Sequence, residues 1–372
     1  MTEDSGNRAE SHKATPKPQG NRPPARHHIL PQFYLRGFTA SRPDTLWCYD
    51  KDTCRVTPAS VRNAAVRKLY YSFPAEGGTL DKQSFETALS ELEDRAAAAI
   101  RTLTKRRVVS DQGKIDLAEF VALMYTRVPA FRENWQRIMG RWADMKLVGL
   151  TYDDDRCRAL IAEVQAEKPT GVSVTPKDIR EAILQGRVQT SLTLPSTLSF
   201  VIDFAGRMEL GLAQMEWVLL AAPPEMEYVT SDNPVCREAP ARDERSMENP
   251  GLGLASLEVT FPASRELALL ASWQPSTHSY VVASPAVVRE INRRTVMCAQ
   301  RFVYSPRKSD GLLRLVRKHS KRKPEVQLAT DWEAGGATLK ITTPSLAINS
   351  LVSMLAGKRL HSNDHSTGRE RE

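Results

Sequence analysis

The sequence feature that most constrains the fold is a thirteen-residue stretch near the start of the chain, residues 26–38. It reads Arg-His-His-Ile-Leu-Pro-Gln-Phe-Tyr-Leu-Arg-Gly-Phe and combines two histidines, two arginines, a proline and three aromatic residues. Residues 1–25 before it are polar, rich in proline and almost free of large apolar side chains, so we predict a disordered tail there. A globular pattern begins directly after this stretch, which makes it the start of the folded part.

The composition is that of a globular protein with a real hydrophobic core. With 372 residues and 41% hydrophobic content, the chain can form one large domain or two. The five cysteines have no Cys-x-x-Cys spacing, which fits free thiols in a reducing compartment better than a disulfide framework. No apolar run approaches the ~18 residues that a membrane span requires, and no signal peptide is visible. We therefore expect a cytoplasmic protein.

The net charge of +8 is concentrated in one segment of the chain. Residues 307–323 hold eight Lys and Arg side chains against a single Asp, so this segment alone carries +7. A basic run of this kind is more often a solvated face that has no partner. Nucleic acid is the candidate partner of residues 307–323 if the run does bind one.

Hydrophobic periodicity predicts an N-terminal hairpin followed by a long helical block. Residues 45–50 and 54–57 alternate as two strands around a polar turn. Helical spacing then begins at residue 81, and Pro129 interrupts it. The helices expected in this block cover residues 81–104, 111–128, 130–142, 154–167, 176–187 and 196–212.

Strands return in the second half of the chain. They are expected at residues 216–221, 227–230, 257–261, 266–272 and 301–304, with a helix from Ser284 to Thr295 before the last one. A strand at 338–342 and a helix at 344–356 complete the pattern. The expected fold class is α+β, with a mixed or antiparallel sheet and a large helical insertion between the N-terminal hairpin and the C-terminal strands.

This pattern also suggests how the chain divides into parts. We expect one α+β domain over residues 26–306. A basic C-terminal extension with a terminal helix should follow over residues 307–359, and a disordered tail over residues 360–372.

Two polar motifs could together form a site. In an extended chain, adjacent histidines point to opposite sides, so one of His27 and His28 can face a given site. We favour His28, because Pro31 and the aromatic residues after it would fix its surroundings. Asp232 and Asn233 follow a predicted strand, where active-site loops often lie. The alternative for these two residues is an Asp/Asn-Pro turn that hydrogen-bonds its own backbone.

Carboxylates on the first long helix are further candidates. Glu86 and Glu93 are seven residues apart and project from a common side, at the border of the apolar stripe. Partly buried carboxylates at such a border can bind a metal ion or move protons. The alternative is that both are solvated glutamates at the rim of the helix.

Three further residues could bind a substrate. Arg127 and Arg132 lie on either side of the helix break and could hold an anionic group, or could pair with Glu119 or Glu133. Asn292, at the border of its helix, could face the same cleft. There is no glycine-rich phosphate loop, no Gly-x-Ser-x-Gly elbow and no His-Glu-x-x-His motif, and too few histidines for an ordinary zinc site.

These motifs resemble those of an uncharacterised, mainly bacterial family, domain of unknown function 4238. The similarity covers roughly residues 26–306. It rests mainly on His27-His28-x-x-Pro31-Gln32-Phe33-Tyr34-Leu35-x-x-Phe38 and on Ser231-Asp232-Asn233-Pro234. The family's usual Pro-Leu-Ser-Pro reads Pro-Ala-Ser-Arg here, at residues 262–265. The resemblance implies a shared fold and a shared site but no reaction.

Polar residues that define a family pattern suggest a functional cluster. One imidazole with two or three carboxylates suits Mg²⁺ or Mn²⁺ better than zinc. The favoured function is therefore a metal-dependent hydrolase of a phosphoester, resembling a nuclease. In such a hydrolase we expect His28, Asp232 and Asn233 to be catalytic. Glu86, Glu93 and Asp232 would bind the metal ion, and Arg127, Arg132 and Asn292 would bind the substrate. The alternative is a non-enzymatic ligand- or protein-binding module in which the His/Asp cluster is structural, so enzymatic activity itself stays open.

Overall fold

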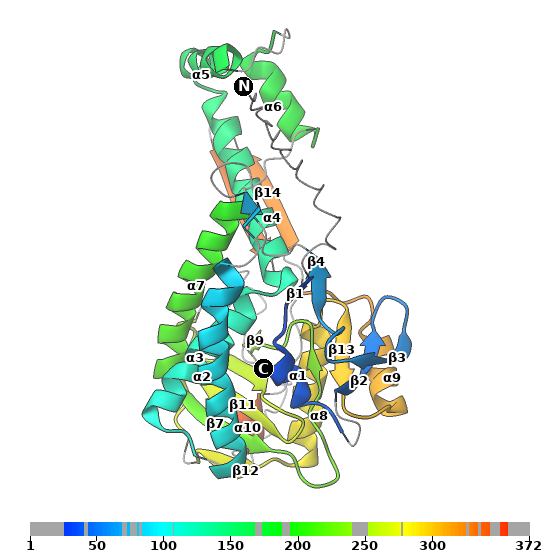
Figure 1. Cartoon of the computed structure of the whole chain (residues 1–372). Helices are drawn as coiled ribbons and strands as arrows, with labels where there is room; N and C mark the ends of the chain where they lie inside the picture. Colours follow the sequence, from blue (N-terminus) through cyan, green and yellow to red (C-terminus); the bar gives the residue numbers. More distant parts are fainter. Residues whose placement is uncertain are drawn as a thin grey trace, which may run out of the picture.

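The computed structural model describes most of the chain between residues 26 and 355. The described ranges are residues 26–40, 44–68, 73–74, 80–81, 84–106, 108–167, 173–187, 194–239, 252–276, 278–324, 327–333, 336–342 and 350–355. The disordered tails predicted for residues 1–25 and 360–372 lie outside these ranges. The described part forms a body that contains two sheets, with a helical arm extending from it (Figure 1).

The predicted N-terminal hairpin becomes half of a four-stranded antiparallel sheet. Strands β2 (Thr45–Asp50) and β3 (Arg55–Ser60) pair around a turn in which the Asp50 carboxylate accepts a hydrogen bond from the backbone N–H of Asp52, at 2.9 Å. Strand β13 (Phe302–Ser305) pairs with β2, and the short β8 (Thr230–Ser231) pairs with β13. Three segments far apart in the sequence therefore meet in one sheet.

A second, five-stranded sheet forms the centre of the body. Its order is β12 (Tyr280–Val282), β7 (Glu216–Ala221), β11 (Leu267–Ser272), β10 (Glu258–Pro262) and β9 (Cys236–Glu238). Only the β12–β7 pair is parallel. Every residue of β10 and β11 is buried, and β11 is accordingly apolar along almost its whole length, whereas β10 also buries Glu258 and Thr260.

The helical insertion runs from residue 84 to residue 214. It contains α2 (Ser84–Arg106), α3 (Asp111–Thr126), α4 (Pro129–Leu150), α5 (Asp154–Glu167), α6 (Pro176–Leu184) and α7 (Leu194–Gln214). Helices α2, α3 and α7 pack beside the sheets, whereas α4 leads out of the body to α5 and α6 at the far end of the arm (Figure 1). Pro129 does not interrupt a continuing helix but begins α4 at a position where a missing N–H costs nothing.

The opening stretch connects the insertion to the sheets. It forms β1 (Arg26–His28), which pairs with β4 (Val66–Lys68), and the short helix α1 (Gln32–Arg36). The ring of Tyr34 stacks on Phe261 of β10, with centroids 5.3 Å apart, and meets Phe120 of α3 edge-on. Its hydroxyl bonds to Thr230 at 2.7 Å and donates to the Pro262 carbonyl at 2.8 Å. One side chain thus joins a helix and both sheets.

The C-terminal part adds two helices, a hairpin and a short last helix. Helix α8 (Pro285–Cys298) contacts both sheets, and α9 (Asp310–Lys318) packs Leu312 and Val316 against the four-stranded sheet. Strands β14 (Gln327–Glu333) and β15 (Gly336–Thr342) form a hairpin, and α10 (Leu351–Leu355) lies within the predicted last helix. Residues 73–74 and 80–81 form a further short pair, β5 and β6.

The predicted fold class is confirmed: the chain is α+β, with antiparallel and mixed sheets and a helical insertion between the N-terminal hairpin and the later strands. None of the helices in the described ranges combines the length and apolarity needed to cross a membrane.

Candidate functional site

Asp232 is the most heavily bonded residue of the predicted cluster. It follows β8 directly, and its carboxylate accepts three backbone N–H groups in a row, from Gln300 at 2.8 Å, Arg301 at 2.9 Å and Phe302 at 2.9 Å. Its own N–H donates to the Phe302 carbonyl at 3.0 Å. Both carboxylate oxygens are therefore engaged in holding β8 to the turn between α8 and β13.

A buried lysine lies on the other side of the same turn. The Lys51 ammonium donates to the carbonyls of Val296, Ala299 and Arg322 at 2.7–2.9 Å, and it caps the C-terminal end of α8. Burial lowers the pKa of Lys51 to about 8, with the Asp232 charge acting in the opposite direction. Burial likewise raises the pKa of Asp232, against the three N–H groups and Lys51. The two buried charges stabilise each other across the turn.

Asn233 and Ser231 complete a self-bonded turn. The Ser231 hydroxyl donates to the Asn233 carbonyl at 2.8 Å and accepts its N–H at 3.2 Å, while the Asn233 amide donates to the Cys298 carbonyl at 2.8 Å. The hydrogen bonds within this turn come from Ser231, whereas the Asp232 and Asn233 side chains bond to backbone groups of residues 298–302. The Asn233 side-chain oxygen is buried without a hydrogen-bond partner in the described part of the chain.

His28 lies at the end of β1. Its Nε2 is 3.2 Å from the side-chain nitrogen of Gln32, which lies four residues further on, at the start of α1. Its carbonyl accepts a hydrogen bond from Arg127 at 2.8 Å. His27 is buried, so the two histidines do differ in exposure as an extended chain predicts.

Glu93 is paired with Arg127 through one of its carboxylate oxygens. The Arg127 guanidinium is only 3% exposed and donates to the Glu93 carboxylate at 2.7 Å. The two other acids that the sequence offered as partners pair elsewhere, Glu119 with Arg95 and Glu133 with Arg67. The Arg127–Glu93 pair joins α2, the end of α3 and β1.

Asn292 also bonds to backbone. Its side-chain oxygen accepts the N–H of Val229 at 3.0 Å and its amide donates to the Glu227 carbonyl at 2.9 Å, which fixes the segment before β8 onto α8. Arg132 is half-buried near the start of α4, and the side chain of Glu86 lies outside the described residues.

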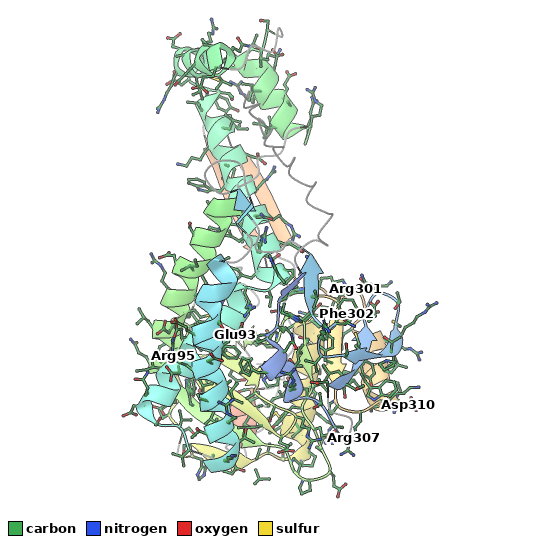
Figure 2. The ribbon with its side chains drawn as sticks, viewed as in Figure 1. Glu93, Arg95, Arg301, Phe302, Arg307 and Asp310 are labelled. Atoms are coloured by element: carbon green, nitrogen blue, oxygen red, sulfur yellow. The ribbon has the colours of Figure 1, made fainter. Side chains whose placement is uncertain are left out.

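Two of the predicted metal ligands, Glu93 and Asp232, lie apart, and the side chain of the third, Glu86, lies outside the described residues. Within the described ranges no group of three or more His, Cys, Asp and Glu side chains could hold a metal ion. Figure 2 shows Glu93 on the helical side of the molecule, whereas Arg301 and Phe302, whose N–H groups bind Asp232, lie on the side of the four-stranded sheet. The structure therefore splits the expected cluster into two separate structural sites.

Sequence reasoning missed a buried ionic network on α8. Arg294 is fully buried and donates to Glu258 of β10 at 2.7 Å and to Glu290 at 3.3 Å. Glu258 also accepts the N–H groups of Leu351 and Val352, which open α10, both at 3.1 Å. Glu290 and Arg294 are four positions apart on one helix, but the partners of Glu258 lie 36 to 94 positions away, so no local pattern marks Glu258.

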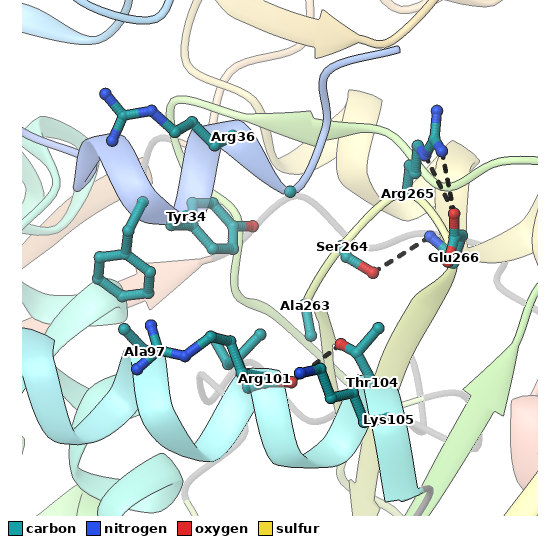
Figure 3. Close-up of a pocket in the computed structure, with 13 residues that line it drawn as sticks. Tyr34, Arg36, Ala97, Arg101, Thr104, Lys105, Ala263, Ser264, Arg265 and Glu266 are labelled. Atoms are coloured by element: carbon teal, nitrogen blue, oxygen red, sulfur yellow. Dashed lines mark hydrogen bonds and ion pairs between the residues drawn. The ribbon is translucent and has the colours of Figure 1, made fainter. Parts of the chain in front are cut away.

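It also missed a cavity of about 390 Å³. The cavity lies between α1, the second half of α2 and the turn that joins β10 to β11 (Figure 3). Four basic side chains line it, together with the acidic Glu266. A signal existed in the sequence, since Arg265 replaces the proline that usually ends this turn in the similar family.

Comparisons with known proteins agree with the sequence motifs. A family model described as a protein of unknown function, DUF4238, matches residues 26–309. Neither the curated proteins nor the solved structures give a significant match.

Proposed function

The chain belongs to the DUF4238 family, and we propose that it is a non-enzymatic binding protein that holds the phosphate backbone of nucleic acid. Its motif residues fasten the fold, and its partner surface is the exposed side of α9. The observation that carries the proposal is the basic character of this side.

The bonding of the motif residues favours a structural role over metal-dependent hydrolysis. A Mg²⁺ or Mn²⁺ ion needs carboxylate oxygens that are open to it. Both oxygens of Asp232 accept backbone N–H groups, and Glu93 is paired with Arg127. A metal ion at Asp232 would have to replace three short hydrogen bonds to a charged group, each worth roughly 1.5–3 kcal/mol. The hydrolase therefore remains the second candidate, and it requires a response to metal ions.

The basic surface of α9 is fixed by the amphipathic character of the helix. Leu312 and Val316 are buried against the four-stranded sheet, which turns the opposite side of α9 outward. We define the α9 surface as the six exposed basic residues on and beside this helix. They are Arg307, Lys308, Arg314, Arg317, Lys318 and Lys321.

Few acids offset these charges. Asp310 is the one acidic residue within the segment, and Glu227 lies 3.3 Å from Arg307. Figure 2 shows Arg307 and Asp310 on the same outer side of the body. Like charges so close together repel one another in the free protein, and a polyanion relieves that repulsion.

Phosphate groups are the chemistry that such a surface recognises. Each lysine or arginine that neutralises a phosphate releases a counter-ion, so affinity falls steeply with salt. Contacts to phosphates do not read the bases. We therefore expect binding that is insensitive to base sequence.

The test uses fluorescence anisotropy to measure how tightly the protein binds a labelled 20-base-pair DNA duplex. Affinity of the wild type should fall about 10- to 1,000-fold between 50 and 200 mM salt, because up to six phosphates are neutralised. The triple variant Arg314→Glu/Arg317→Glu/Lys318→Glu should bind at least about tenfold more weakly at 50 mM salt.

The matched control reverses three exposed charges on the arm, Arg156→Glu/Arg158→Glu/Lys177→Glu. It changes the net charge by the same amount, on α5 and α6, and should bind within about twofold of the wild type. Equal weakening in both variants, no duplex binding by the wild type, or binding to anionic lipid vesicles in place of DNA would each overturn the proposal.

A further inference from the structure

The cavity between α1 and α2 is independent of the α9 surface. Its volume of about 390 Å³ lies within the range of small-molecule sites. In Figure 1, α2 and α9 lie on opposite sides of the body. What the cavity accommodates can therefore be argued and tested separately.

The inner wall of the cavity is apolar. Phe33 and Tyr34 of α1 face Ala97 and Ile100 of α2, and Ala263 closes the third side. The Tyr34 hydroxyl points away into the core, where it bonds to protein groups. This wall therefore offers carbon atoms and no free polar group from Tyr34.

The rim carries the charges. Arg36 lies 2.8 Å from Asp44, and Arg265 lies 3.1 Å from Glu266, so these two cations have acidic partners. Within the described residues, Arg101 and Lys105 make no ion pair, although they lie one turn apart on the side of α2 that lines the cavity (Figure 3). Two cations beside an apolar wall are thus available for a ligand.

The wall is held in place by backbone contacts. The N–H of Arg265 donates to the Gly37 carbonyl at 2.9 Å, which joins the end of α1 to the turn between β10 and β11. A side chain at position 37 would lie 3.1 Å from the Tyr34 carbonyl and 3.4 Å from the Ala263 carbonyl. The close approach that glycine permits here keeps two sides of the cavity fixed before any ligand arrives.

We propose that this cavity binds a small amphiphilic anion, with an apolar chain against Phe33, Tyr34 and Ile100 and a carboxylate or phosphate head group at Arg101 and Lys105. Burial of the chain supplies most of the affinity, because it removes apolar surface from water. The two cations orient the ligand and exclude uncharged molecules of the same shape.

Isothermal titration calorimetry with four probes tests both halves of the proposal. Decanoate and decyl phosphate carry the chain and the charge, decanol carries the chain alone, and acetate carries the charge alone. At least one of the first two should bind at least about tenfold more tightly than decanol and acetate. Binding of decanoate alone identifies a carboxylate ligand, and binding of decyl phosphate alone identifies a phosphate ligand.

The variant Arg101→Glu/Lys105→Glu should weaken binding of the amphiphile at least about tenfold. Both side chains are exposed on a helix surface, so the fold should tolerate the change, and circular dichroism checks that it does. The α9 triple variant is the matched control, because it also reverses surface charges but leaves the cavity intact. It should bind the amphiphile like the wild type, which separates failure of this proposal from failure of DNA binding.

Three results would overturn the inference. The first is that neither amphiphile binds the wild type at 1 mM. The second is that acetate binds as tightly as decanoate. The third is that the α2 variant binds the amphiphile as tightly as the wild type does.

Discussion

Single polar side chains in this protein hold backbone segments together over long sequence distances. Asp232, Asn292 and Lys51 each bond to two or three backbone groups that would otherwise be buried without partners. Buried backbone groups left unpaired cost about as much as a lost hydrogen bond, so loops without regular structure need such side chains. Residue types alone do not distinguish this role from a catalytic one, which explains why Asp232 and Asn292 were predicted as site residues.

The ion pair between Asp50 and Arg301 also joins segments far apart in the sequence, and it gives a prediction about how stability depends on pH. Two hydrogen bonds from Arg301, at 3.2 and 2.8 Å, lower the pKa of Asp50 to about 2. Because the folded pKa is depressed, the stabilisation is fully present above about pH 4 and is lost as the pH falls through 2. The variant Arg301→Gln should return the pKa of Asp50 towards its ordinary value near 4, as measured by NMR titration of the carboxyl carbon.

The control for this titration is Arg207→Gln, which removes an exposed arginine paired with Asp203 on α7. It should leave the Asp50 titration unchanged. If Asp50 titrated near pH 4 in the wild type, the hydrogen-bonded pair would not persist in solution.

At the scale of elements, the sequence predicted local structure well and long-range pairing poorly. The hairpin of β2 and β3 and the start of α8 at Pro285 follow from turn residues and caps that act within a few positions. The insertion of β13 between β2 and β8 could not be predicted, because its partners lie about 70 and 250 residues away. Helix α9 was missed because it is only nine residues long and lies in a segment that was interpreted by its charge alone.

The same reasoning applies to the candidate site. The sequence singled out Asp232 and Asn233 and offered a turn bonded to its own backbone as one interpretation, whereas the side chains of both residues bond to the distant backbone of residues 298–302. It could not place Glu93 relative to Asp232, since one lies in the helical insertion and the other after a strand. It also could not foresee the cavity, whose three walls come from residues about 70 and 160 positions apart.

Removal of one side chain that bonds to distant backbone groups should measurably lower the free energy of unfolding. Asn292→Ala deletes the two hydrogen bonds that fix Val229 and Glu227 to α8. Two buried backbone groups lose their partners, so the free energy of unfolding should fall by about 2–3 kcal/mol in urea titration. The control, Gln112→Ala, removes an exposed hydrogen bond to Asp116 and should cost less than about 0.5 kcal/mol. Equal stability of the two variants would contradict a fastening role for Asn292.

At the scale of the whole molecule, the residues that hold backbone segments together lie apart from the two surfaces that we propose for binding. The motif residues lie inside the body, where they connect the helical insertion to both sheets. The surfaces available to partners lie elsewhere, on α9 and in the cavity beside α2. The family motifs therefore mark what holds this fold together, and the α9 surface and the cavity are what we propose for binding.

The most direct test of this account is thermal unfolding of the wild type and of Asp232→Asn, each with 5 mM Mg²⁺, 5 mM Mn²⁺ or EDTA. Asparagine replaces a carboxylate oxygen by an amide group that cannot accept the backbone N–H groups, at a cost of about 3 kcal/mol. The account predicts a melting temperature about 4 °C lower in the variant and no metal response in either protein. Stabilisation of the wild type by Mg²⁺ or Mn²⁺, absent in a variant that melts normally in EDTA, would contradict it and support the hydrolase.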